Sequence, residues 1–304
     1  MRLIVRLPNW VGDVCMALPT LTALAERGVD LQVVGKGFAG GLLAAHGWPH
    51  AKTVSGLRAS AAAVRSLGIE RGLLLTNSFG SAAQFRLGGV RACGYRAECR
   101  TPLLARGVPR QRGLHEVESF WRLGQEVAAW LALIPLPPTP PASLGLRLGQ
   151  GAHDAAAKAL ERAGVHSAYV LLCPLAAGTI NGQPKIWPGF PLLARLLQER
   201  GVTVVACPGP GEEEASASAL PGARQLPGLG LDAYAAIAAG ALVTVANDSG
   251  PMHLAAAVDA PVIGIFGVAD PQRTRPWSVQ GHTLGDAQGW PAAAAVIERV
   301  VHFL

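Results

Sequence analysis

The chain has 304 residues, of which half are hydrophobic and 15% are charged, so its composition excludes an intrinsically disordered protein. Its length favours two domains, each large enough to bury a core. The net charge of +6 is uneven, because residues 1–150 carry 17 Lys and Arg against 8 Asp and Glu, whereas residues 151–304 carry 9 against 12. The first half is therefore expected to face an anionic partner.

Cysteine content and hydropathy indicate which cellular compartment to expect. The five cysteines form no CxxC pair, which favours reduced thiols and argues against a cysteine-based metal site. The amino-terminal segment lacks the apolar run of a signal peptide, and prolines interrupt the most apolar region near residues 135–141. We therefore expect a monomeric cytoplasmic protein without a bound metal or cofactor, which at most contacts a membrane surface peripherally.

The first half of the chain alternates between apolar runs and amphipathic segments. Asp13 is expected to open a helix as its N-cap, at the carboxyl end of the first strand, where open α/β sheets place ligands. Strands are predicted at 3–7, 31–34 and 73–77, and helices over about fourteen residues from Asp13 and over 115–130, with His115 at the surface.

A basic segment follows, with seven arginines between Arg86 and Arg112 and a single acid, Glu98. Its glycines and prolines predict loops. Arginine forks suit phosphate and carboxylate groups, so an anionic small molecule or a lipid headgroup fits this segment. Nucleic acid is disfavoured because Tyr95 is the only interleaved aromatic residue and no recognition motif occurs.

A stiff proline-rich spacer at 136–141 separates two regions of alternating strands and helices. We place the domains at 1–145 and 146–304, and the last helix could return to the first domain. The alternation predicts one parallel sheet flanked by helices in each half. In the second half, strands are predicted at 168–172, 202–206, 241–246 and 261–267, and helices at 151–163, 188–200 and 291–302.

One strand–turn–helix stretch, residues 243–257, stands out in the second half. Asn247, Asp248 or Ser249 can cap the helix, and Pro251 suits its first position. A helix N-terminus at a strand end binds phosphate or diphosphate, although a capped turn without a ligand fits the same pattern. If the two domains face each other, this turn, Lys185 and Asp13 meet in one cleft, where a diphosphate clamp and a base would support metal-free group transfer.

Three segments carry a resemblance to a known family. They are Asn9-Trp10-Val11-Gly12-Asp13 with Pro19, Lys185-Ile186-Trp187-Pro188 with Phe190, and Asn247-Asp248-Ser249-Gly250-Pro251-Met252-His253. With these segments, in this order, the chain resembles glycosyltransferase family 9, the ADP-heptose:lipopolysaccharide heptosyltransferases.

The resemblance implies a GT-B fold, in which two Rossmann-like domains with parallel sheets face a central cleft. It implies metal-independent, inverting transfer of heptose from ADP-heptose to the lipopolysaccharide inner core. Asp13 would be the general base, Lys185 would hold the donor phosphates, and Asp248 would contact the donor sugar. The remaining donor-binding candidates are Thr179, Ser249, Gly250, Met252 and His253, and the acceptor-binding candidates are Asn9, Trp10, Arg86, Arg91 and Arg96.

Other functions stay open at this point. The same scaffold could transfer a different sugar from another nucleotide. The chain could also be a catalytically silent nucleotide- or glycolipid-binding protein, and its basic isoelectric point leaves a nucleic-acid-binding α/β protein as a further class.

Overall fold

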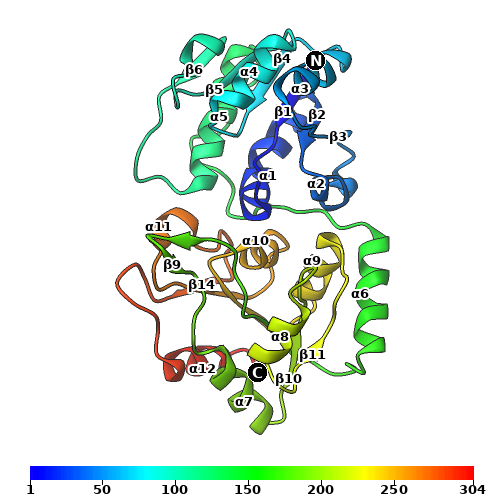
Figure 1. The fold of residues 1–304 in the computed structure, drawn as a ribbon, viewed down its shortest axis with the longest axis vertical. Coiled ribbons are helices and arrows are strands. Elements are labelled where there is room, and N and C mark those ends of the chain that lie inside the picture. The colour runs from blue at the N-terminus through cyan, green and yellow to red at the C-terminus, as the bar shows by residue number, and fades with distance from the viewer. The chain divides into compact units, whose positions relative to one another are not determined.

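The computed structural model describes residues 1–304, which form two compact units, Met1–Pro141 and Ala142–Leu304 (Figure 1). The boundary directly follows the proline-rich spacer, a few residues before the predicted one. The residues after it belong to the second unit because Ser143 Oγ donates to Asp259 Oδ2 at 2.6 Å and Leu146 N donates to Ala257 O at 2.8 Å.

The first unit contains one six-stranded parallel sheet. Its strands are β1 (Arg2–Arg6), β2 (Asp30–Gly35), β3 (His50–Lys52), β4 (Arg71–Leu74), β5 (Arg91–Tyr95) and β6 (Arg106–Val108). Its α-helices are α1 (Val11–Glu26), α2 (Phe38–Leu42), α3 (Leu57–Ser66), α4 (Phe79–Leu87) and α5 (Glu116–Trp130), with short 3-10 turns at Ala44–His46 and Thr101–Leu103. The sheet has the order β3-β2-β1-β4-β5-β6, so the strand order reverses between β1 and β4. Helix α1 packs against α5, and α3 packs against α4 (Figure 1).

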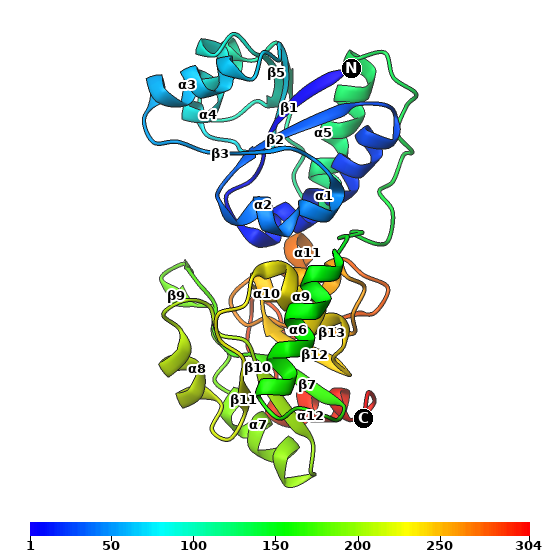
Figure 2. The same cartoon turned by 90° about the vertical axis from the view of Figure 1, so that its right-hand side faces the viewer.

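The second unit repeats this topology and adds a short hairpin. Its strands are β7 (Tyr169–Cys173), β8 (Thr179–Ile180), β9 (Gln183–Pro184), β10 (Thr203–Ala206), β11 (Arg224–Gln225), β12 (Val243–Asn247), β13 (Val262–Ile265) and β14 (Gly281–Leu284). Its helices are α6 (Gln150–Arg162), α7 (Phe190–Glu199), α8 (Glu213–Ala219), α9 (Leu231–Ala239), α10 (Gly250–Ala257), α11 (Pro271–Thr274) and α12 (Ala293–Val301). The parallel sheet has the order β11-β10-β7-β12-β13-β14, while β8 and β9 pair separately and antiparallel. Helix α6 packs against α9 (Figure 2).

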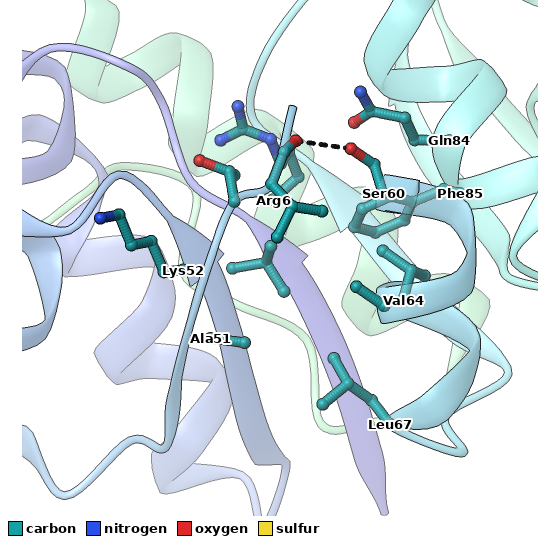
Figure 3. Close-up of a pocket in the computed structure, with 12 residues that line it drawn as sticks. Arg6, Ala51, Lys52, Ser60, Val64, Leu67, Gln84 and Phe85 are labelled. Carbon is teal, nitrogen blue, oxygen red and sulfur yellow. Dashed lines mark hydrogen bonds between the residues drawn. The ribbon is translucent and has the colours of Figure 1, made fainter. Parts of the chain in front are cut away.

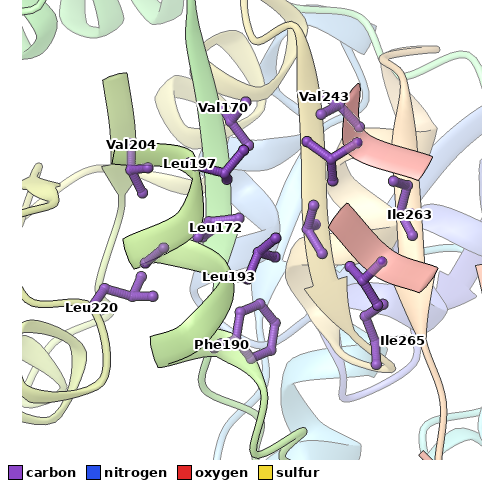
Figure 4. Close-up of a cluster of buried hydrophobic side chains, with 14 of the residues drawn as sticks. Val170, Leu172, Phe190, Leu193, Leu197, Val204, Leu220, Val243, Ile263 and Ile265 are labelled. Atoms are coloured by element: carbon purple, nitrogen blue, oxygen red, sulfur yellow. The ribbon is translucent and has the colours of Figure 1, made fainter. Parts of the chain in front are cut away.

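Each sheet is covered by helices whose apolar residues recur at helical spacing. In the second unit, Phe190, Leu193 and Leu197 of α7 lie fully buried against β7, β12 and β13 (Figure 4). Val296 and Val300 of α12 belong to the same core, so the last helix packs on its own unit. Burying such side chains stabilises the fold by roughly 1.5–3 kcal/mol each.

Most predicted strands and helices are confirmed, but three details differ. Helix α1 begins at Val11 with Trp10 as its N-cap, so Asp13 lies within the first turn and does not cap the helix. The arginine-rich segment holds two strands, β5 and β6, where loops were expected. Helix α10 begins at Gly250, so Pro251 occupies its second position; a missing N–H is tolerated throughout the first turn.

None of the helices combines the length and the apolar character that a membrane crossing requires.

Candidate functional site

The strand ends at the centre of the second sheet form a site around Asn247. Strands β7 and β12 are neighbours, and the strand order reverses between them, which is where Rossmann-type sheets bind ligands. The chain leaves β7 through the loop that contains the β8–β9 hairpin and Lys185. It leaves β12 through Asp248 and Ser249 into α10. The two predicted donor segments are therefore adjacent, although 63 positions separate Lys185 from Asp248.

Asn247 links the segment that follows β7 to the end of β12. Its side chain is fully buried, Oδ1 accepts from Trp187 N at 2.9 Å, and Nδ2 donates to Pro174 O at 2.9 Å. A longer contact of 3.4 Å runs from Nδ2 to Cys173 O. Since one amide satisfies groups on both sides of the loop, Asn247 fixes where the loop returns to the sheet and hence where Lys185 lies. The sequence suggested only a helix cap at this position.

Lys185 and Asp248 form an ion pair beside this amide. Lys185 Nζ donates to Asp248 O at 2.6 Å and lies 3.3 Å from Asp248 Oδ2. The Asp248 side chain is 10% exposed and that of Lys185 is 20% exposed. An ammonium has three donors, so one remains for a ligand oxygen.

The N-terminus of α10 adds unsatisfied backbone donors to the site. No side-chain cap is formed there, because the hydroxyl of Ser249 turns back and donates to Asn247 O at 3.2 Å. Pro251 has no N–H, which leaves the N–H groups of Gly250 and Met252 in the first turn. The side chain of Met252 is fully buried, so only its backbone can face a ligand. His253 is also buried within this helix.

Thr179 lies on the hairpin that leads into Lys185. It pairs with Pro184 across the two short strands, so its exposed side chain sits at the end of the hairpin next to Lys185. Asn181 and Gly182 form the turn with φ angles of +51° and +77°. An Asn-Gly turn of this kind is the strongest short-range hairpin signal, so the sequence did carry the information for this element.

In the first unit, the predicted acceptor residues Asn9 and Trp10 lie between β1 and α1, shortly before Asp13. Asp13 is half-buried in the first turn of α1, where the helix dipole favours a carboxylate. Burial, and to a lesser extent the charge of Asp13, raise the pKa of the Cys15 thiol. Asn9 Oδ1 accepts from Arg6 Nη2 at 2.8 Å, and the ring of Trp10, 63% exposed, lies 5.2 Å from Lys36 Nζ.

The structure separates the three arginines that the sequence grouped as acceptor ligands. Arg91 is the first residue of β5 and its N–H donates to Glu70 O, so it lies at the amino edge of the sheet. Arg86 lies in the last turn of α4, which returns the chain to that same edge. Only Arg96 follows the carboxyl end of a strand, and its Nε donates to Gly107 O at 3.0 Å. Arg86 and Arg91 are thus remote from the strand end that carries Asp13, since parallel strands place all their carboxyl ends at one edge.

The sequence grouped Arg100 with the anion-binding arginines and placed His115 at the surface, but both residues are buried and structural. Arg100 is fully buried; its Nε donates to Tyr95 O at 2.8 Å and its Nη1 donates to Thr76 O. Burial lowers its pKa to about 10. His115 caps α5 through its Nδ1, which accepts from Val117 N. The role of Arg100 has no sequence signal, because it depends on contacts made by folding. The cap is local: Glu118 Oε2 accepts from His115 N at 2.8 Å and completes a capping box, so Glu118 three residues after His115 was a signal that the sequence did carry.

Fold and site together define a protein built from two Rossmann-like α/β domains, the second with a lysine and an open helix N-terminus at its switch point. The chain belongs to glycosyltransferase family 9 (heptosyltransferase), whose family model matches residues 58–300. That range includes Lys185 and Asp248 but not Asp13. The resemblance predicted from the three sequence segments is therefore confirmed.

Individual relatives support this membership. Lipopolysaccharide heptosyltransferase 2 of Escherichia coli K12 is 26% identical over 93% of this chain and 88% of its own length. Lipopolysaccharide heptosyltransferase 3 of Escherichia coli is 32% identical, but over only 39% of this chain and 37% of its own length. The chain thus spans little more than a third of the latter relative.

Solved structures share the fold along the whole chain. The E. coli ADP-heptose lps heptosyltransferase II superposes with a TM-score of 0.81 at 24% identity, covering 100% of this chain and 98% of that one. The E. coli heptosyltransferase WaaC, solved with ADP, gives a TM-score of 0.76 at 21% identity with full coverage of both chains. The predicted GT-B type of fold, with two parallel-sheet domains, is confirmed.

Proposed function

We propose that this chain is an inverting, metal-independent glycosyltransferase that moves a heptose from ADP-heptose to a hydroxyl of the lipopolysaccharide inner core. The observation that carries the proposal is the Asn247-centred arrangement, which holds Lys185 and the N-terminus of α10 at the switch point of the second sheet. Membership of the family and a relative aligned over 93% of the chain support the choice of donor and acceptor.

The second unit would bind the donor. The free donor of Lys185 and the backbone N–H groups of Gly250 and Met252 would hold the diphosphate, and Thr179 would add a hydroxyl. Asp248 would repel a phosphate, so we assign it to the hydroxyls of the donor sugar and to the orientation of Lys185. The role of His253 as a donor ligand remains a prediction.

The charges of Asp13, Lys185 and the N-terminus of α10 would drive the transfer step. Asp13 would accept the proton of the acceptor hydroxyl while the oxygen attacks the anomeric carbon from the side opposite the diphosphate. The bond from that carbon to the phosphate oxygen breaks, which inverts the configuration and leaves ADP. Lys185 and the α10 dipole would stabilise the charge that develops on the leaving diphosphate, so the mechanism needs no metal.

The first unit would bind the acceptor, an acidic glycolipid, through Asn9 and Trp10 beside Asp13. Its net positive charge suits a peripheral contact of a monomeric enzyme with the inner face of the inner membrane. We propose acceptor binding without Arg86 and Arg91, since both lie at the opposite edge of the sheet.

The test is a transfer assay with ADP-heptose and a series of truncated lipopolysaccharide acceptors, run with and without EDTA. We expect a heptosylated product whose new linkage, assigned by NMR, has the anomeric configuration opposite to that of the donor, at a rate that EDTA leaves unchanged. Product only with another nucleotide sugar would identify a different transferase on this scaffold. Tight ADP binding without any product would identify a binding protein, and either result contradicts the proposal.

A further inference from the structure

The linker that joins the two units, residues 134–143, is attached to the first unit through α1. Arg27 directly follows this helix, and it donates from Nε to Ile134 O at 2.9 Å and from Nη2 to Pro135 O at 3.1 Å. The linker therefore begins at the C-terminal end of the helix that carries Asp13 in its first turn.

Helix α5 holds the next residues of the linker. Trp121 Nε1 and Gln125 Nε2 donate to Pro137 O at 2.9 Å and 2.8 Å. Because α1 and α5 pack together on one face of the first sheet, the linker lies on that face (Figure 2). Helices α3 and α4, and the small pocket that they enclose beside Arg6 (Figure 3), lie on the other face and take no part in this attachment.

In the second unit the linker is attached to α10. Ser143 Oγ donates to Asp259 Oδ2 at 2.6 Å, and Leu146 N donates to Ala257 O at 2.8 Å. Ala257 is the last residue of α10, and Asp259 follows in the turn beyond it. The linker thus ends at the C-terminal end of the helix whose N-terminus forms the donor site. Each of the two helices that carry groups of the proposed reaction holds the linker at its opposite end.

Asp259 is an unusual residue for the end of a helix. Its φ of +54° lies in the left-handed region, where this position of a helix end usually has glycine. A carboxylate is also disfavoured by the negative end of the helix dipole. Its Oδ1 is buried without a hydrogen-bond partner, so the hydroxyl of Ser143 is the only protein group that binds this carboxylate. Such strain persists where a function requires it, and the contact that Asp259 makes is the attachment of the linker.

An anion at the N-terminus of α10 would also act on the far end of the helix. The helix has only eight residues, a length of about 12 Å. Residues 252–257 are buried, so the helix is held rigidly along this length. Hydrogen bonds in a chain polarise one another, so a negative charge at the first turn makes the last carbonyls stronger acceptors. Ala257 O is one of these carbonyls, and it binds Leu146 N.

We propose that Ser143 and Asp259 couple the donor site to the linker, so that an anion bound at the N-terminus of α10 tightens the attachment at its C-terminal end. Asp259 is then a positioning residue that does not touch the substrate. The inference rests on the proposed function for the identity of the anion, which is the diphosphate of the donor. Coupling of this kind is reciprocal, so a linker detached from α10 must weaken diphosphate binding.

The experiment measures hydrogen exchange of the Leu146 amide by NMR in the full chain, without ligand, with ADP and with inorganic diphosphate. In the wild-type protein, saturation with either ligand should slow this exchange about tenfold. In Ser143→Ala the slowing should fall below about twofold, and the Kd for ADP from calorimetry should rise by up to the factor that the exchange loses. Ser143→Thr keeps the hydroxyl and should restore both quantities.

Two further variants separate coupling from the general loss of a contact. Arg27→Gln loosens the linker at α1 only, so ADP should slow Leu146 exchange as in the wild-type protein. Asp259→Gly removes the carboxylate and suits the positive φ, so it should match Ser143→Ala. The double variant should show no greater loss than either single variant, because both substitutions remove the same contact.

The outcomes distinguish this inference from the proposed function. If bound ADP leaves Leu146 exchange unchanged, or slows it equally in Ser143→Ala and the wild-type protein, the coupling is overturned while the transferase stands. Slowing by diphosphate that depends on Ser143, in a protein that transfers no heptose, would support the coupling and refute the proposed function.

Discussion

Replacing Asn247 with Ala tests whether this amide positions the donor-binding loop. The substitution removes two hydrogen bonds of 2.9 Å, which leaves the N–H of Trp187 and the carbonyl of Pro174 buried and unpaired. Each unpaired group costs about 1–3 kcal/mol, so the second unit should lose about 2–6 kcal/mol of unfolding free energy. This is a large share of the roughly 5–15 kcal/mol that stabilises a typical domain.

The same change should weaken donor binding, because Lys185 lies two residues before Trp187. We expect the Kd for ADP to rise about 10- to 100-fold, as for the loss of a charge-assisted contact. Urea unfolding measures the stability, and hydrogen exchange of the Trp187 amide reports the local contact. In the control Ser249→Ala, which removes one hydroxyl contact of 3.2 Å, the stability loss should stay below about 1 kcal/mol.

If Asn247→Ala loses less than about 1 kcal/mol, retains a protected Trp187 amide and binds ADP like the wild-type protein, the amide does not position the loop.

Three further predictions follow from single contacts and burial. Lys185→Ala should raise the Kd for ADP about 10- to 100-fold, and it should lower the free energy of unfolding because Asp248 loses its buried cation. Lys185→Arg should retain part of the ADP affinity and part of the stability in the same calorimetric and urea measurements. Burial raises the pKa values of Cys93 and Cys173 to about 12. Above the ordinary thiol pKa the unfolded chain therefore releases protons that the folded chain keeps, so the free energy of unfolding measured with urea should fall from about pH 8 to about pH 10. A flat profile over this pH range would contradict the prediction. Cys99 is the exposed thiol and should react with a thiol reagent at once, while Cys93 and Cys173 should react only after unfolding; fast reaction of either buried thiol in the native protein would be inconsistent with the structure.

The sequence was informative where a local pattern determines structure. The apolar run before Asn247 and the Pro251-containing helix after it predicted β12 and α10 to within a few residues. Strands β5 and β6 were missed because β5 buries only the small residues Ala92, Cys93 and Gly94 before Tyr95, which carry little β-strand signal. The Asn-Gly turn between β8 and β9 could have been recognised from the sequence.

The sequence indicates candidate residues for the site but not the contacts between them. Lys185 and Asp248 were both singled out as candidates, yet their ion pair depends on β7 and β12 being neighbours. The role of Asn247 depends on the same pairing. For the arginines, proximity in sequence was misleading. Arg86 and Arg91 are close to Arg96 in sequence, but Arg86 lies at the end of α4 and Arg91 at the start of β5, so both lie at the other edge of the sheet.

The most direct test of the proposed transferase is a pair of constants measured on Asp13→Asn. The substitution keeps the shape of the side chain and its place in the first turn of α1, but an amide cannot accept the proton of the acceptor hydroxyl. We predict that heptose transfer from ADP-heptose falls by a factor of about 100 or more while the Kd for ADP stays within about twofold of the wild-type value. Transfer at the wild-type rate by Asp13→Asn would contradict it.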